Sequence, residues 1–230
     1  MRRSYFTAFA GIMAALAAAA PAGAQQRSST EWRTKPADSR FRAIAAKDAE
    51  RNLATYARCV VQNRYERARS FVLSPYSSPE QAKAVARIVK TGGDVCLRGG
   101  FDEVRMKLSS NVMAGALAQA LVLKDYPDLP AVVRSSQVAA EVESARAAQL
   151  HPEELFGRCI VQRDPASAYA LFTSLAWTPD ETGAIRSLGD DLANCLAAGS
   201  TIKINAMYVR NVSAVAAYRL AQQIQPRGAK

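Results

Sequence analysis

A block of motifs containing two cysteines occurs twice in this sequence, about one hundred residues apart. Three motifs recur in the same order, at offsets of 100, 100 and 99 residues: Arg58-Cys59-Val60-Val61-Gln62 as Arg158-Cys159-Ile160-Val161-Gln162, Ser78-Pro79-Glu80-Gln81 as Thr178-Pro179-Asp180-Glu181, and Cys96-Leu97 as Cys195-Leu196. Chance similarity between Ala-rich helices is the alternative, but such an ordered recurrence is hard to obtain from composition alone, so we interpret the chain as two copies of one unit. The copies are expected over residues 39–123 and 132–225.

Each copy contains the start and stop signals of several helices. From Ser39 to Val60, apolar residues recur every three or four positions, which is the period of one helix face. Asn63 in the first copy and Asp164-Pro165 in the second are the expected starts of the next helix. A third helix is expected to begin at a capping box and to end at a glycine in each copy: at Ser78 and Gly100, and at Thr178 and Gly199.

The remaining segments complete a helical bundle. Fourth helices are expected over 104–123 and 204–221, a proline-containing linker over 124–131, and a lead-in helix over 132–150 that precedes His151-Pro152. No strand-like alternation of useful length occurs in the sequence, so the predicted fold is all-α, with one internal disulfide in each repeat. The copies can stack as a short solenoid or pack face to face about a pseudo-two-fold axis. Two repeats leave no interior member, which favours face-to-face packing.

The N-terminus has the form of a secretory signal peptide. Two arginines precede an apolar run over 6–20, and Ala22-Gly23-Ala24 has the small-x-small form of a signal peptidase site. We expect residues 1–24 to be removed and the mature chain to be periplasmic or secreted, without a transmembrane span. A retained membrane anchor is the alternative, but the run is shorter than the ~20 residues that a bilayer requires. Residues 25–38 are expected to form a disordered arm and 226–230 a short tail.

Four cysteines follow the expected export signal, which favours disulfides over metal or redox chemistry. Three pairings are possible, and the repeat selects pairing within each copy: Cys59 with Cys96, and Cys159 with Cys195. By loop entropy each bridge is expected to stabilise the fold by ~4 kcal/mol, less any strain. Zinc is the rival use, but the sequence has no C-x-x-C motif and His151 is the only histidine. We therefore expect no metal or other cofactor.

No catalytic set can be assembled from the sequence. His151 precedes a proline at an expected helix start, so we interpret it as a boundary residue rather than a base. Adjacent acids occur three times, but neighbouring side chains on a helix diverge by ~100° and do not converge on one substrate atom. The pairs are Asp102-Glu103, Glu153-Glu154 and Asp190-Asp191. An enzyme whose site is built from residues scattered along the chain stays an open alternative.

Positive charge is concentrated in the first copy. The formal net charge is +10; residues 40–123 contain 14 basic and 7 acidic residues, whereas residues 124–230 contain 11 of each. Such an excess can indicate an anionic partner, for example nucleic acid, a lipid headgroup or an envelope polymer, and it can equally be a solvated surface. Arginines with aromatic neighbours can bind phosphates and stack on bases. The candidate anion-binding residues on this basis are Arg58, Arg64, Arg67 and Arg69.

The motif set also resembles a known group of bacterial proteins. Arg-Cys-(Val/Ile)-Val-Gln, a following Asp-Pro, Thr-Pro-Asp-Glu, and Asn-Cys-Leu before a glycine look like uncharacterised exported alphaproteobacterial proteins with cysteine-paired helical repeats. The first copy departs from this pattern where Asn63-Arg64 replaces Asp164-Pro165. The resemblance implies export and a repeated helical fold, but it implies no activity. We therefore expect a non-catalytic exported binding or structural module, with anionic-ligand binding through the first copy as the alternative.

Overall fold

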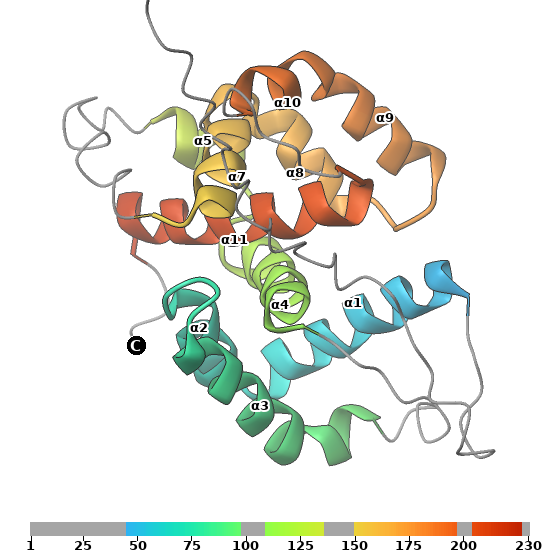
Figure 1. Ribbon diagram of the computed structural model, residues 1–230, viewed down its shortest axis with the longest axis vertical. Coiled ribbons are helices and arrows are strands. Elements are labelled where there is room, and N and C mark those ends of the chain that lie inside the picture. The colour runs from blue at the N-terminus through green and yellow to red at the C-terminus, as the bar shows by residue number, and fades with distance from the viewer. Residues whose placement is uncertain (1–44, 98–108, 136–149, 197–203, 227–230) are drawn as a thin grey trace, which may run out of the picture. The chain divides into compact units, whose positions relative to one another are not determined.

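The computed structural model of this chain describes residues 45–97, 109–135, 150–196 and 204–226, which form a bundle of helices (Figure 1). In chain order the helices are α1 (Ala46–Asn63), α2 (Tyr65–Leu73), α3 (Pro79–Leu97), α4 (Ser110–Asp125), α5 (Leu129–Arg134), α7 (Pro152–Arg163), α8 (Pro165–Thr173), α9 (Pro179–Ser187), α10 (Gly189–Cys195) and α11 (Ala206–Ile224). These ranges contain no strand, and the predicted all-α fold is confirmed.

Several expectations fall outside the described residues. They are the signal peptide, the disordered arm, most of the lead-in helix, the glycines Gly100 and Gly199, the acids Asp102-Glu103 and the last four residues of the tail. Within the described ranges, no helix is both long enough and apolar enough to span a bilayer.

Both disulfides form within the units in which the repeat placed them. Cys59 bonds to Cys96 and ties α1 to the last turn of α3, and Cys159 bonds to Cys195 and ties α7 to the end of α10. The predicted pairing is therefore confirmed. Disulfides persist in oxidising compartments, so they fit a location outside the cytoplasm.

The third helix of each unit begins at the predicted capping residue. Ser78 Oγ accepts a hydrogen bond from the Gln81 N–H at 3.1 Å, and Thr178 Oγ1 accepts one from the Glu181 N–H at 3.4 Å. The Gln81 and Glu181 side chains reach back one residue further than a capping box predicts, to the backbone N–H groups of Ser77 and Trp177. Both of those residues have a positive φ, 56° and 64°, so the two turns share one unusual backbone conformation.

The predicted start of α2 is wrong by one residue. Asn63 is the last residue of α1, and its Nδ2 donates to the carbonyl oxygen of Cys59 at 2.9 Å. The N-cap of α2 is Arg64, whose side chain has no acceptor atom and makes no capping hydrogen bond. The equivalent residue of the second unit, Asp164, does cap α8, because its carboxylate accepts from the Ser167 N–H at 2.9 Å.

The third helix of the second unit is interrupted, whereas its sequence predicts one continuous helix. Instead of one helix from Thr178 onward, α9 and α10 follow each other across the buried residue Leu188. The interruption lies between Glu181, where the offset between the units is 100, and Cys195, where it is 99. One missing residue in a continuous helix would turn Cys195 by ~100° about the axis. A break beside Gly189, which has low helix propensity, allows that cysteine to face α7 again.

The expected linker is partly helical. As predicted, α4 ends before Pro127, but α5 begins at Leu129, inside the segment 124–131. His151 is the N-cap of α7, and its Nδ1 accepts from the Glu153 N–H at 3.3 Å. The interpretation of His151 as a helix-boundary residue is therefore confirmed.

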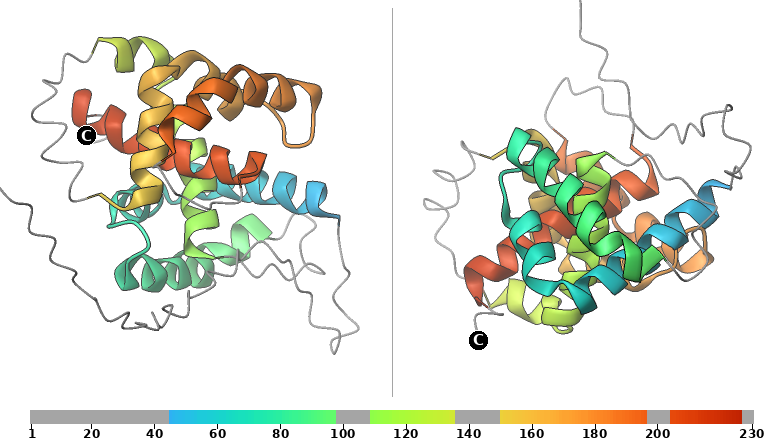
Figure 2. Two further views of the ribbon diagram at one scale, coloured as in Figure 1. Left: turned by 45° about the horizontal axis from the view of Figure 1, so that its top comes forward. Right: turned by 90° about the horizontal axis from the view of Figure 1, so that it is seen from below.

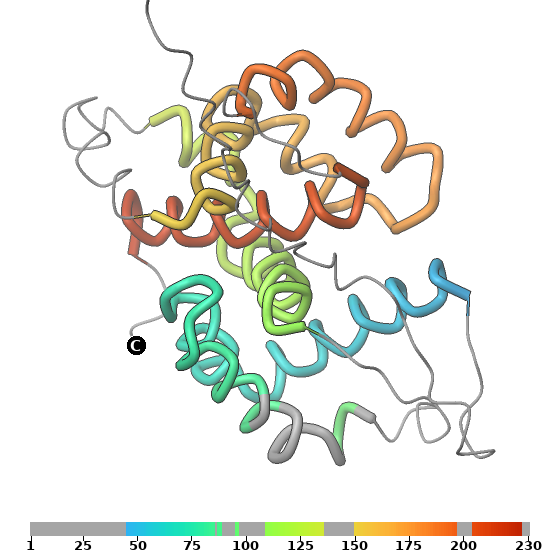
Figure 3. Tube along the Cα trace, viewed as in Figure 1, coloured from blue at the N-terminus to red at the C-terminus, as the bar shows by residue number. Residues whose placement is uncertain are grey.

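Helices α4 and α11 form the centre of the bundle (Figures 1 and 2). The first half comprises α1 to α4 and the second half α7 to α11. Helices α1 to α3 lie on one side of the central pair and α7 to α10 on the other, as the Cα trace in Figure 3 also shows. All residues from Val209 to Gln222 of α11 are buried. Gly115 allows the two central helices to touch, because a Cβ added there would lie 2.4 Å from the Asn211 Cβ.

Two hydrogen bonds across this interface correspond at an offset of 100 residues. Gln119 Nε2 on α4 donates to the carbonyl oxygen of Phe172 at 2.6 Å, and Arg219 Nε on α11 donates to that of Val72 at 2.9 Å. Each central helix thus reaches the end of the second helix of the opposite half. These reciprocal contacts place Gln119 of α4 and Arg219 of α11 at equivalent positions on the two sides of the interface.

Candidate functional site

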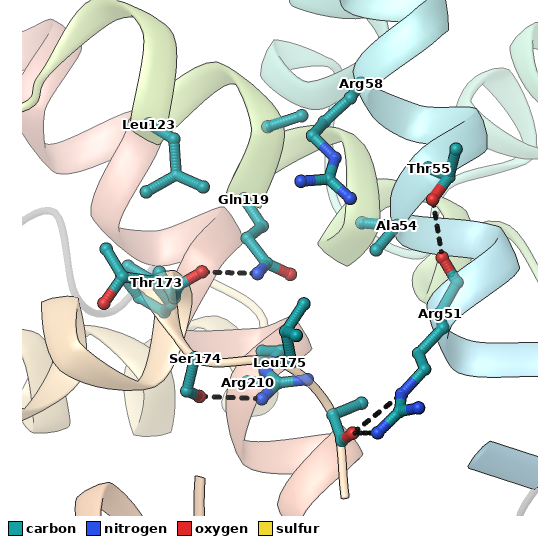
Figure 4. A pocket seen from close by; sticks show the side chains of 14 residues that line it. Arg51, Ala54, Thr55, Arg58, Gln119, Leu123, Thr173, Ser174, Leu175 and Arg210 are labelled. Atoms are coloured by element: carbon teal, nitrogen blue, oxygen red, sulfur yellow. Dashed lines mark hydrogen bonds between the residues drawn. The ribbon is translucent and has the colours of Figure 1, made fainter. Parts of the chain in front are cut away.

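A cavity of about 160 Å³ lies between the two halves (Figure 4). Its walls come from α1, α4, the end of α8 with the turn that follows, and α11. The lining residues are Arg51, Ala54, Thr55, Arg58, Ala116, Gln119, Ala120, Leu123, Phe172, Thr173, Ser174, Leu175, Ala176 and Arg210. One water needs ~10–15 Å³, and a cavity of ~150 Å³ can hold benzene. This cavity therefore has room for a small organic molecule.

The lining combines positive charge with apolar surface. Three arginines contribute to it, and none of the described lining residues is an aspartate or a glutamate. Arg51 and Arg58 are exposed at the surface, whereas Arg210 is 6% exposed. Alanines, Leu123 and Phe172 supply the apolar wall. Few polar groups on an apolar wall are typical of small-molecule sites.

Arg58 directs its guanidinium group into the cavity (Figure 4). It makes no hydrogen bond or ion pair within the described part of the chain. Arg51 lies about two turns before Arg58 on the same face of α1. Its Nε and Nη2 donate to the carbonyl oxygen of Ala176 at 3.3 and 3.2 Å. Arg51 thus bridges the two halves, while Arg58 keeps its donors available.

Arg210 is held in place by groups of its own half. It forms an ion pair with Glu181 at 2.8 Å and donates to Ser174 Oγ at 3.1 Å. Burial lowers the pKa of Arg210, and the nearby charges of Glu181 and Glu50 act in the opposite direction. Its buried Nε has no hydrogen-bond acceptor among the residues that the structure describes.

Glu50 lies close to this ion pair. Burial is the main cause that raises the pKa of Glu50, and the charge of Glu181 raises it further, while a hydrogen bond from Trp177 and the charge of Arg210 lower it. Neither Glu50 nor Glu181 lines the cavity. A general acid or base must reach the reacting atoms, so this carboxyl pair is not placed to act on a molecule in the cavity.

Charged side chains occupy the equivalent place on the other side of the interface. Glu154 and Arg219 form a buried ion pair, and Arg219 also donates to two backbone carbonyl oxygens of the first half. Arg158 donates to Gln223 Oε1 at 2.6 Å. We call these four residues the Arg219 cluster. At an offset of 100 they correspond to Ala54, Arg58, Gln119 and Leu123 of the cavity.

Smaller side chains contribute to the space. Alanine stands at three cavity positions where the other half has a larger residue: Ala54 against Glu154, Ala120 against Leu220, and Ala176 against Tyr76. Gln119 also replaces the longer side chain of Arg219. The hydrogen bonds from Gln119 and Arg219 to the opposite backbone occur on both sides of the interface. The space that side chains fill beside α7 is open beside α1.

Of the four arginines singled out from the sequence, Arg58 alone lines the cavity. Arg64 lies at the junction of α1 and α2, and Arg67 is exposed on α2. Arg69 is half-buried, and its Nη2 donates to Gln222 Oε1 on α11 at 3.2 Å. The cavity therefore does not gather the predicted set.

Sequence reasoning missed Arg51 and Arg210. Arg51 has no local motif that distinguishes it from other arginines of the first helix. Arg210 lies in the expected fourth helix of the second copy, where none of the three repeated motifs occurs. One signal was present, since Ala54 stands where the second copy has Glu154, and such a lost acid indicates that the two sides differ in charge.

Glu153 and Glu154 have different partners, so this adjacent pair diverges, as predicted. Glu154 belongs to the Arg219 cluster, while Glu153 lies near Tyr208, whose pKa burial and the Glu153 charge raise to about 12. Asp191 accepts a hydrogen bond from Arg163 Nε at 2.6 Å. In the described ranges, no group of three His, Cys, Asp or Glu side chains is arranged to hold a metal ion.

Comparisons with known proteins leave the function to be argued from the cavity. No family model matches the chain, and no curated protein or solved structure does. The resemblance drawn from the repeated motifs stays a prediction.

Proposed function

We propose that this chain is an exported, non-catalytic helical repeat protein whose two halves form a small-molecule binding module. The observation that carries the proposal is the cavity between the halves, because its walls come from both of them. Each half is closed by its own disulfide, and the one between Cys59 and Cys96 anchors the wall helix α1 to α3. A prearranged apolar cavity with a few directed polar groups is the common form of a ligand site.

The residues of the cavity favour binding over catalysis. Its hydroxyl groups belong to Thr55, Thr173 and Ser174, and none of the described lining residues is a histidine, a cysteine or an acid that could activate them. The four cysteines are paired in disulfides. His151, the sole histidine, is engaged at the start of α7.

Export is the second part of the proposal and has its own test. The full chain is expressed with its own N-terminus, and the mass of the periplasmic product is measured before and after reduction. We expect a product that begins near Gln25 and has no free thiol. A full-length product that stays in the cytoplasm with reduced cysteines would contradict export.

The binding function is tested with a cavity-filling variant. A library of small acids, bases and neutral compounds is screened by ligand-observed NMR against the wild type, Ala54→Leu and Ala82→Leu. Ala54 lines the cavity, whereas Ala82 is exposed on α3 and serves as the control. We expect compounds whose binding is lost in Ala54→Leu and kept in Ala82→Leu. Equal binding to both variants, or a turnover that a cavity substitution abolishes, would overturn the proposal.

Anionic-polymer binding by the first half is the alternative that the charge distribution favours. Arg64 and Arg67 are exposed on that half, away from the cavity lining. Binding to DNA or anionic vesicles is measured at two salt concentrations, since such binding weakens steeply with salt. Salt-sensitive binding that Arg64→Gln with Arg67→Gln removes and Ala54→Leu retains would support this alternative.

A further inference from the structure

We propose that the cavity takes a small organic monocarboxylate, with its carboxylate at Arg58 and its apolar body against Leu123 and Phe172. This inference rests on the proposed binding function and adds the chemical class of the ligand. Three observations carry it: the charge of the lining, the contrast with the Arg219 cluster, and the size and polarity of the cavity.

The uncommitted hydrogen-bond donors of the lining favour one carboxylate at Arg58. Arg210 is neutralised by Glu181, and Arg51 keeps its charge but directs its Nε and Nη2 to a backbone carbonyl oxygen. Arg58 is the lining cation that has no partner within the described ranges. A planar guanidinium binds a carboxylate through two parallel hydrogen bonds.

The second half shows what this place holds when the chain itself supplies the anion. There Glu154 places a carboxylate at the helix face that faces Arg219, and Arg158 is held by Gln223. In the first half the acid is replaced by Ala54, so the chain supplies no carboxylate at this position. Leu123 stands at the position of Gln223 and has no acceptor for Arg58. The first half thus lacks the whole ion pair, because Ala54 and Gln119 replace Glu154 and Arg219, and Arg58 lacks the acceptor that Gln223 provides for Arg158.

The size and polarity of the cavity favour a carboxylate over a phosphate. At about 160 Å³ the volume is close to the ~150 Å³ that holds a benzene molecule. Part of the wall is apolar, with Ala120, Leu123 and Phe172 among the lining residues. Oxygen atoms of a phosphate against such a wall would lose water without gaining hydrogen bonds. An aromatic or short aliphatic acid places its carbon atoms there and its charge at Arg58.

The probes are benzoate, its neutral isostere benzamide, and inorganic phosphate. Each is titrated into the mature protein, and backbone amide chemical shifts are followed by NMR. We expect benzoate to bind at least about tenfold more tightly than benzamide or phosphate, with shift changes around Arg58 and Phe172. Equal affinity for benzoate and benzamide, or tighter binding of phosphate, would overturn the assignment of the ligand class.

Two arginine variants locate the charge. Arg58→Gln is expected to weaken benzoate binding about tenfold and to change benzamide binding by less than about twofold. Arg64→Gln removes the same charge from the end of the same helix, outside the cavity lining, and is expected to leave both affinities unchanged. Both arginines are exposed, so circular dichroism should show folded protein in each case.

The outcomes separate this inference from the function on which it rests. Benzoate binding that Arg58→Gln leaves intact, or no binding of benzoate at all, refutes the carboxylate assignment. The binding function itself fails only if the wider library also shows no ligand that depends on Ala54.

Discussion

The two sides of the interface between the halves share the same contacts to backbone carbonyl groups, but one side is filled by side chains and the other is open. Beside α7, the Arg219 cluster fills the space with a buried ion pair and its hydrogen bonds. Beside α1, the equivalent space is a cavity with an uncommitted arginine at Arg58. The change from Glu154 to Ala54 and from Arg219 to Gln119 removes one buried pair. The side beside α7 thus has a buried ion pair, and the side beside α1 has a cavity in its place.

The approach of the helix backbones differs in the same direction. Gly157 lets α7 lie directly against α11, because a Cβ added there would lie 2.3 Å from the carbonyl oxygen of Val212. At the equivalent position of α1, Ala57 is completely buried and keeps its methyl group at the interface. The side chain at a helix contact sets the distance between helices, so the second half can close more tightly than the first.

Breaking the ion pair tests the filled side, and it is expected to have the largest effect. Arg219→Ala leaves Glu154 as an uncompensated buried charge and removes two bonds to backbone carbonyls. We expect a loss of about 3–5 kcal/mol in the free energy of unfolding, measured by urea denaturation. The matched change on the cavity side, Gln119→Ala, removes one hydrogen bond and should cost only about 1 kcal/mol. Equal losses would show that the two sides do not differ as described.

Removing the disulfides one at a time compares the halves as whole units. The bridges close loops of nearly equal length, with sequence separations of 37 and 36 residues. The pairs Cys59→Ser with Cys96→Ser, and Cys159→Ser with Cys195→Ser, are each expected to lower the free energy of unfolding by about 4 kcal/mol. A difference beyond about 1.5 kcal/mol between the two double variants would mean that loop entropy is not the dominant cause.

A methyl group at the α7–α11 contact tests the tighter closure of the second half. Gly157→Ala should lower the free energy of unfolding by about 1–3 kcal/mol, because the new Cβ meets the Val212 backbone. Gly183→Ala is the control: nothing lies within 4 Å of its added Cβ. That variant should stabilise α9 by about 0.5–1 kcal/mol through helix propensity. The account is contradicted if thermal unfolding shows Gly157→Ala to be as stable as the control.

Glu50→Gln tests the electrostatics beside the cavity and is expected to change the free energy of unfolding least. The pKa of Glu50 is raised from its ordinary value of 4.5, so the folded state favours the uncharged form. Its contribution to stability is therefore complete at low pH and is lost as pH rises through the raised pKa. Glu50→Gln should match the wild type near pH 3 and exceed it by about a few tenths of a kcal/mol at pH 7. Melting curves at both pH values provide the check, and a variant less stable at pH 7 would reverse the sign.

Local chemistry allowed much of this fold to be predicted. Asp164, Thr178 and His151 begin helices because each has an acceptor for free N–H groups, and that property is visible in sequence. The disulfide pairing followed from the repetition of the cysteines. Asn63 was misplaced because an asparagine at a helix end can equally donate to its own helix. The break at Leu188 was not predicted because it depends on tertiary structure: Cys195 must face α7 to form its disulfide.

The cavity could not be predicted in the same way. Its arginines lie on α1 and α11, and nothing local brings Arg51, Arg58 and Arg210 together. Their proximity depends on how α4 and α11 cross, which is set by contacts such as Gly115 with Asn211. Comparing the two copies position by position points to the right region, because the exchange of Glu154 for Ala54 is visible in the sequence. The way in which α4 and α11 cross is not visible in the sequence.

Returning an acid to the cavity tests the central claim most directly. Ala54→Glu restores the residue type of the second half, four residues before Arg58 on the same helix, and Ala54→Gln fills the same space without charge. The measurement is the melting temperature of both variants with and without benzoate. Benzoate should raise that of the wild type but not that of Ala54→Glu, because the introduced carboxylate already occupies Arg58. Ala54→Glu should exceed Ala54→Gln by about 1–2 °C at pH 7, and this excess should vanish below the pKa of the introduced acid. Equal melting temperatures at pH 7, together with undiminished benzoate stabilisation of Ala54→Glu, would contradict the account.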